Sequence, residues 1–194
     1  MNIFYLDYDV RKCAEYHNDK HVVKMILEYC QLLSTAHRVL DGTEIQTKSK
    51  TGRNKKIWRL PDDRETILYS ATHINHPSAI WCRTTDSNYH WLHSLLVELC
   101  GEYTFRYGKT HKCEQIGLVN ELRNCPNHIR IGQFTGPTPA MPDEVKLSNS
   151  LESYRNYYIN NKTKLANWKN RPTPEWYEEG INTNSNKFGN NSIV

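Results

Sequence analysis

The stretch from Ala14 to Leu40 constrains the fold most, because its apolar residues recur at the spacing of one helical face. One broad side of a single predicted helix collects Ala14, Val22, Met25, Ile26, Tyr29, Leu32, Leu33, Ala36 and Leu40. An amphipathic helix gains most of its stability by burying such a face against other elements. The sequence therefore predicts a long helix that packs into a helical core.

Polar residues of the same stretch follow the two margins of the apolar face. One margin carries His17, His21, Lys24 and Glu28, each three or four residues from the next, and the other carries Asp19, Cys30 and His37. Groups at such a margin are half-desolvated, which is where pKa values shift and catalytic side chains are held. We interpret the first row as a candidate reaction site. The alternative is an ordinary amphipathic helix in which Lys24 pairs with Glu28 and the histidines are satisfied at the edge of the core.

The remaining elements predict a mainly α protein. A chain of 194 residues suits one domain, and we expect a compact helical bundle over residues 1–178 with a short N-terminal extended segment (NIFYL) and long loops. Further helices are expected over 62–73, from 77, over 87–107 and from 150, whereas 112–146 is loop-like. The Asn-rich, apolar-poor tail of residues 179–194 is predicted to be disordered.

Cysteine spacing and hydropathy limit the class of protein. The six cysteines are scattered without a C-x-x-C pair, which favours small, reduced core residues over a disulfide framework. No apolar run reaches the length of a signal peptide or a membrane span. We therefore expect a soluble protein that is not exported and contacts no membrane.

A basic segment from Lys48 to Arg59 contains six lysines and arginines and no acidic residue. Gly52 and Asn54 disfavour a helix there, and Trp58 lies within the charged run. A flexible basic loop that carries an aromatic side chain suits a phosphate backbone and an exposed base. The alternative is a solubilising surface loop.

The absence of nucleotide-binding and hydrolase motifs leaves acid–base or amine chemistry. No P-loop, Rossmann or G-x-S-x-G signature occurs. The candidate proton-transfer groups and amine nucleophiles are His17, Asp19, Lys20, His21, His37, His73 and Glu102, with Lys24 and Glu28 beside them. The candidate substrate contacts are Lys55, Lys56, Trp58, His76, Arg83, Asn88 and Arg106.

Two of these groups have alternative interpretations. Glu102 and Arg106 are four residues apart at a buried margin, so they also suit a structural ion pair. His17 and His21 form an H-x-x-x-H pair, which suits a zinc or iron site. The adjacent Glu of the H-E-x-x-H motif is missing and spacing assigns no third ligand, so we expect neither a metal nor a cofactor.

Two resemblances appear once these motifs are set side by side. Over almost the whole chain to Trp176, the sequence resembles a family encoded by tailed bacteriophages. The motifs that carry this resemblance are MNIFYLD, HNDKHVVKMILE, THINHPSAIWCR, EYTFRYGKTHK and MPDEVK…SYRNYY. A second resemblance, in the order of elements, is to the pyrimidine-dimer DNA glycosylases: a short N-terminal strand, a His-bearing helix, an HP…W turn, an E-Y-x-x-R-Y-G helix end and a closing RP…WY segment. That family is compact, helical and DNA-repairing, and it uses an N-terminal amine with a helix glutamate.

The chain departs from this second family in two respects. Its second residue is Asn, which favours retention of Met1, and its first helix has His and Lys at the expected place of the glutamate. We therefore expect a phage-encoded enzyme that acts on a base or nucleotide of nucleic acid, DNA before RNA, by glycosylase/lyase-type excision or by base modification. Its place would be the cytoplasm of the infected bacterial host. A metal-dependent hydrolase using His17 and His21, and a non-enzymatic binding module or host-takeover inhibitor, are the alternatives.

Overall fold

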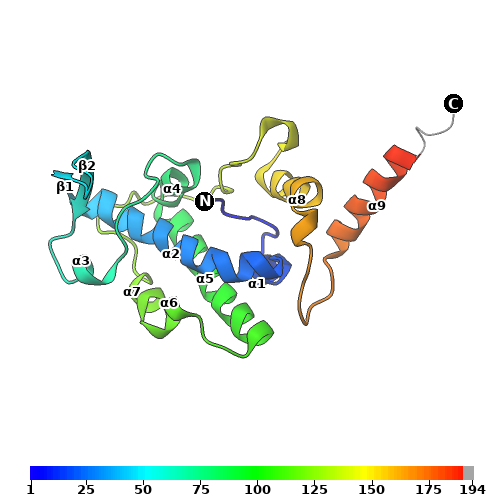
Figure 1. The fold of residues 1–194 in the computed structure, drawn as a ribbon, viewed down its shortest axis with the longest axis horizontal. Coiled ribbons are helices and arrows are strands. Elements are labelled where there is room, and N and C mark those ends of the chain that lie inside the picture. The colour runs from blue at the N-terminus through cyan, green and yellow to red at the C-terminus, as the bar shows by residue number, and fades with distance from the viewer. Residues whose placement is uncertain (190–194) are drawn as a thin grey trace.

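The computed structural model describes the backbone of residues 1–189 and the side chains of residues 1–185. Helices dominate the fold, as predicted, and two long helices form its centre: α2 (Asp19–Asp41) and α5 (Asp86–Tyr107), which pack against each other (Figure 1). The short helices α1 (Val10–Tyr16) and α4 (Pro77–Cys82) pack against α5 and α2 respectively. The apolar faces predicted for the two long helices are buried in this core.

The predicted single helix from Ala14 to Leu40 is wrong in one detail, because it is broken between α1 and α2. His17 ends α1 in an extended conformation, and the side chain of Asn18 accepts a hydrogen bond of 2.9 Å from the His21 N–H. This N-cap satisfies a free donor of a new helix start. His17 therefore lies outside α2, and the row of polar residues is not one helical stripe.

The predicted flexible basic loop is instead part of a β-hairpin, which lies at one end of the molecule (Figure 1). Strands β1 (Thr43–Lys48) and β2 (Asn54–Arg59) pair antiparallel. Gly42 joins α2 to β1, and a Cβ at this position would lie 2.4 Å from the Arg38 carbonyl oxygen. A residue with a side chain would clash with this oxygen, so only glycine allows the chain to turn from α2 into β1 at this point.

The remaining elements lie around the α2–α5 pair (Figure 1). The short helices among them are α3 (Arg64–Ile67), α6 (Lys112–Gln115), α7 (Leu118–Glu121), η1 (Asp143–Val145) and η2 (Thr163–Leu165), and the longer ones are α8 (Ser150–Asn161) and α9 (Glu175–Gly189). Asn149 caps α8 by accepting the Glu152 N–H at 2.9 Å, as the sequence predicted. The tail predicted to be disordered from residue 179 is helical as far as Gly189, because α9 packs on α8. Residues 190–194 of that prediction lie outside the described residues.

Two further predictions concern the cysteines and the membrane. All six cysteines are free, and five of them are buried in the core. Within residues 1–189, no helix combines the length and the apolar character that crossing a bilayer requires.

Candidate active site

The N-terminal segment is fixed against α2 by buried side chains and backbone hydrogen bonds. Phe4 and Leu6 are buried, the Phe4 N–H donates to the Tyr29 hydroxyl at 3.1 Å, and the Leu6 N–H contacts Cys13 Sγ at 3.4 Å. An N-terminus without such contacts is usually poorly ordered. Here these contacts fix the path of the first residues along α2.

This arrangement brings the chain's α-amino group to a carboxylate on α2. The Met1 nitrogen lies 4.0 Å from Glu28 Oε2, and the Glu28 side chain is only 14% exposed. Lys24, one turn earlier on α2, contacts the other carboxylate oxygen at 3.0 Å with its ammonium group. An amine, a carboxylate and a second ammonium group therefore meet at the edge of the core.

A strained loop before α4 approaches the same place. His73 has a φ angle of +48°, which is unusual for a residue other than glycine. Its neighbour Thr72 is tied to α2, because the Thr72 N–H donates to Thr35 Oγ1 at 3.2 Å. Strained residues held by their surroundings cluster at functional sites.

His76, at the start of α4, lies near the Met1 amine. Its Nδ1 accepts the Ser78 N–H at 3.1 Å and so caps that helix, which leaves Nε2 free of this contact. Burial lowers the pKa of His76, electrostatic interactions with the Met1 amine and His73 lower it further, and Glu28 opposes them. His76 is therefore a neutral imidazole near pH 7, close to both the amine and the carboxylate.

A cavity opens beside Glu28, between α2 and α6. Its volume is about 530 Å³, within the range of small-molecule sites. It is mostly apolar and is lined by Val23, Lys24, Leu27, Glu28, Gln31, Tyr69, His111, Lys112 and Cys113. Glu28, the partner of the Met1 amine, thus borders a space large enough for a nucleobase.

His17, which the sequence placed in the reaction site, is instead a buried support. Its Nδ1–H donates to the Cys13 carbonyl at 2.7 Å, and its Nε2 accepts from the Tyr29 hydroxyl at 3.2 Å. Burial lowers its pKa to about 4. The same Tyr29 hydroxyl holds the Phe4 N–H, so His17 orients the residue that anchors the N-terminal segment.

His21 has a similar supporting position. Its ring stacks on Phe4 with a centroid distance of 4.1 Å, and its Nδ1 accepts from the Tyr158 hydroxyl at 2.6 Å. Burial lowers its pKa to about 2, helped by the charge of His17 and nearby lysines. Both histidines are thus satisfied core residues, the alternative that the sequence left open.

His37 and Lys20 also lie outside the Met1–Glu28 site. His37 is buried, donates to the Tyr89 hydroxyl at 2.8 Å and accepts from Arg64 Nη1 at 2.9 Å. Burial lowers its pKa to about 4, and Arg64 contributes to this shift. Lys20 is exposed at the start of α2.

Asp19, Glu102 and Arg106 form a buried ion network. Arg106 donates to Glu102 at 2.7 Å and to Asp19 at 2.9 Å, and Arg171 donates to the second Glu102 oxygen at 2.8 Å. Burial raises the pKa of Glu102, but the hydrogen bonds from Arg171 and Arg106 outweigh it and the net pKa is lowered. Arg106 is buried and each of its three nitrogens donates a hydrogen bond, so this network ties α2, α5 and the chain after α8 together.

The other predicted substrate contacts are separated in space. Asn88 is buried and holds a loop, since it donates to the Trp81 carbonyl at 3.1 Å and accepts the Thr135 N–H at 2.9 Å. Arg83 is half-buried, which lowers its pKa, and its Nη1 has no hydrogen-bond partner among the described residues. Lys55, Lys56 and Trp58 lie on β2.

The residues present at His17 and His21 do not fit a metal ion. Both ring nitrogens of His17 and the Nδ1 of His21 are already hydrogen-bonded within the core. Within the described residues, no three His, Cys, Asp or Glu side chains gather in a way that could hold a metal. Nothing in this geometry favours the metal-dependent hydrolase.

Sequence reasoning missed the Met1 amine as part of the site. The resemblance implied an N-terminal amine and a helix glutamate, but His and Lys occupied the expected place of that glutamate. The structure instead brings Glu28, included among the marginal polar residues, to the Met1 nitrogen. The sequence feature that could have indicated this placement is the apolar NIFYL segment, because its burial against α2 brings the N-terminus to Glu28.

Comparison with known proteins identifies a family for this chain. A sequence profile described as pyrimidine dimer DNA glycosylase matches residues 1–115, more than half of the chain. The match spans Met1, Glu28, His73, His76 and the lining of the 530 Å³ cavity. No curated protein and no solved structure matches the chain. The chain belongs to the pyrimidine dimer DNA glycosylase family.

Proposed function

We propose that this protein is a DNA glycosylase with lyase activity, in which the Met1 α-amino group is the nucleophile and Glu28 the proton acceptor. The observation that carries the proposal is the 4.0 Å approach of these two groups at a half-buried site. Family membership supports DNA that contains pyrimidine dimers as the substrate. The whole-chain resemblance to tailed-phage proteins supports a role in DNA repair in an infected bacterial host.

An amine beside a carboxylate suits attack on the anomeric carbon of a nucleotide. The amine nitrogen forms a bond to C1′, and the electron pair of the glycosidic bond leaves with the base. Loss of a proton from nitrogen and opening of the sugar ring give an imine, as with other amine nucleophiles. Elimination of the 3′ phosphate from the ring-opened sugar then breaks the strand.

Glu28 suits the proton transfers of this sequence. A carboxylate near the attacking nitrogen accepts the proton that the amine must lose, and the same group can return it. The amine is nucleophilic only in its neutral form, which Glu28 helps to supply by accepting a proton. Because Nδ1 of the neutral His76 accepts the Ser78 N–H, its Nε2 carries the proton and offers a hydrogen-bond donor near the amine.

The cavity beside Glu28 supports action on a base that leaves the helical stack. Enzymes that act on a base within duplex DNA must extrude a nucleotide into a pocket. The apolar lining from Val23, Leu27 and Tyr69 suits the faces of a base, and Gln31 and Lys24 offer polar contacts to its edge. The proposal therefore assigns this cavity to an extrahelical base.

Incision of defined duplexes tests the proposed function. Three labelled duplexes of equal length are compared: one with a single pyrimidine dimer, one with an abasic site, and one undamaged. We expect single-strand incision of the first two and none of the third. If the folded protein incises neither damaged duplex, the proposal fails; incision of the abasic duplex alone would restrict it to the lyase step.

A further inference from the structure

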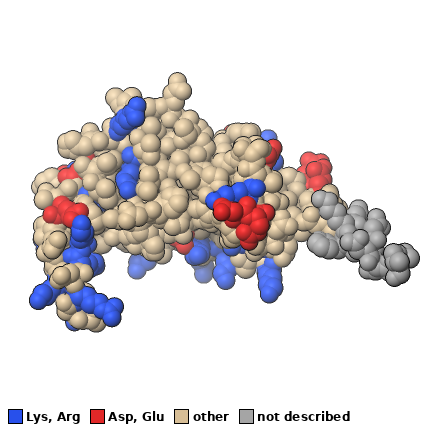
Figure 2. All heavy atoms as spheres, turned by 90° about the horizontal axis from the view of Figure 1, so that it is seen from above, with Lys and Arg blue, Asp and Glu red and all other residues tan. Residues whose placement is uncertain are grey.

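The β1–β2 hairpin concentrates the positive charge of the protein. Residues 43–59 contain six basic residues and one acidic residue, which gives a net charge of +5. The whole chain carries +4, so all other residues together carry −1. Figure 2 shows lysine and arginine side chains projecting from the lobe at the hairpin end of the molecule.

The two faces of β2 differ in whether their basic side chains form ion pairs. Successive side chains of a strand point to opposite faces, so Lys55 and Arg59 share a face that Lys56 does not. Lys56 forms an ion pair of 2.8 Å with Glu44 on β1. Lys55 and Arg59 have no ion pair among the described residues.

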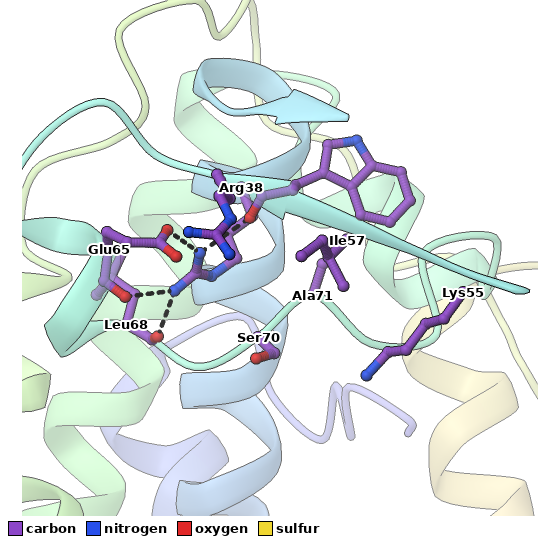
Figure 3. A pocket seen from close by; sticks show the side chains of 9 residues that line it. Arg38, Lys55, Ile57, Glu65, Leu68, Ser70 and Ala71 are labelled. Carbon is purple, nitrogen blue, oxygen red and sulfur yellow. Dashed lines mark hydrogen bonds and ion pairs between the residues drawn. The ribbon is translucent and has the colours of Figure 1, made fainter. Parts of the chain in front are cut away.

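The base of the hairpin is held by one buried arginine. Arg38, which is 5% exposed, donates from Nη1 to the Trp58 carbonyl at 2.9 Å, from Nε to the Tyr69 carbonyl at 2.7 Å and from Nη2 to the Leu68 carbonyl at 2.8 Å. Its remaining contacts are with Glu65. Figure 3 shows the bonds from Arg38 to Glu65 and Leu68. Together with the bond to the Trp58 carbonyl they join α2, the hairpin and the following segment, so β2 has a fixed position relative to the body.

A cavity of about 240 Å³ lies between β2 and this segment. Its lining consists of Arg38, Lys55, Ile57, Trp58, Arg59, Glu65, Leu68, Ser70 and Ala71. Glu65 is engaged by Arg38 and by the Leu60 N–H at 2.9 Å. The groups that remain for a ligand are two cations, Lys55 and Arg59, and the hydroxyl of Ser70, all of which donate hydrogen bonds to phosphate oxygens.

This cavity is close to the Met1–Glu28 site along the chain. Ala71 is two residues from the strained His73, so their Cα atoms are no more than about 7 Å apart. One turn of B-DNA, at about 34 Å, is much longer than this separation. A duplex engaged at the reaction site is therefore long enough to reach the hairpin as well.

We propose that the cavity between β2 and residues 65–71 is a phosphate-binding subsite that holds the DNA backbone beside the reaction site. Lys55 and Arg59 contact phosphate oxygens, Ser70 donates its hydroxyl, and buried Arg38 fixes the hairpin in place. The proposal leaves Lys56, which is paired with Glu44, out of this subsite, whereas the sequence gave Lys55 and Lys56 equal roles. The inference rests on the proposed function for its ligand, DNA, but not on the chemistry at Met1.

The salt dependence of binding to an undamaged duplex tests the subsite. Each lost phosphate contact lowers the slope of log affinity against log salt by roughly one unit. We expect this loss for Lys55→Ala and for Arg59→Ala, and roughly two units for the double variant. Between 50 and 200 mM salt, wild-type affinity then falls about tenfold more than that of the double variant. Lys56→Ala, the matched control on the other face, should keep the wild-type slope because Glu44 already neutralises its charge.

Equal slopes for Lys55→Ala and Lys56→Ala would overturn the proposed subsite, because the two lysines are adjacent in sequence and are distinguished by the face of β2 on which they lie. An unchanged slope in the double variant would overturn it as well. Thermal melts of all variants check that the exposed substitutions leave the fold intact. The measurement uses undamaged DNA and no incision, so the subsite can fail while the glycosylase chemistry stands, and the reverse.

Discussion

Replacing Glu28 by glutamine is expected to lower the rate of strand incision by about two to four orders of magnitude, the usual contribution of a positioned acid–base group. Glutamine keeps the shape of the side chain but cannot accept the proton that the Met1 amine must lose. The fold should survive, because the Lys24 partner of Glu28 is 61% exposed and such a pair contributes less than about 1 kcal/mol. Single-turnover incision of an abasic duplex measures the effect.

Glu121→Gln provides the matched control for this prediction. Glu121 is an exposed carboxylate on α7, away from the described site, so its replacement should leave the incision rate unchanged. A Glu28→Gln variant that is folded and incises within about threefold of the wild-type rate would remove Glu28 from the chemistry.

Acidification from pH 7 to pH 5 is expected to cost the folded protein on the order of 5 kcal/mol. Burial lowers the pKa of His17 to about 4, of His21 to about 2 and of His37 to about 4. In the unfolded chain these imidazoles protonate near pH 6.5, whereas in the folded protein they stay neutral. The unfolded state therefore binds more protons below pH 6.5, and stability present above that pH is lost as pH falls.

Urea unfolding at several pH values measures this loss. Three such histidines give a slope of up to about 4 kcal/mol per pH unit below pH 6.5. Replacing His37 by glutamine, which keeps one hydrogen-bonding group, should reduce the slope by about one third. A free energy of unfolding that is flat between pH 7 and pH 5 would show that these imidazoles are already accessible to protons in the folded state.

The sequence predicted the helical framework well where periodicity and capping agree. The 87–107 helix and the Asn149 cap are confirmed, because both depend on residues close together in sequence. The break at Asn18 was missed because its cap interrupts an apolar pattern that continues on both sides. The hairpin was missed because its strands are exposed and carry no alternating apolar face.

The candidate site could be predicted only in part, because it depends on tertiary contacts. Glu28 was among the marginal polar residues, but its partner is the chain's own α-amino group. His17 and His21 were expected to react and instead hold the N-terminal segment through Tyr29 and Phe4. A histidine at the edge of an apolar face has the same pattern in sequence whether it reacts or supports.

The central claim, that Met1 is the nucleophile, is tested most directly by trapping the imine. The protein is mixed with an abasic duplex and sodium borohydride, which reduces an imine to a stable amine, and the cross-linked peptide is mapped by mass spectrometry. Our account predicts a covalent adduct on the α-nitrogen of Met1, and its loss when that nitrogen is acetylated. An adduct on a lysine side chain, such as Lys24 beside Glu28, or no adduct under conditions in which the strand is incised, would contradict it.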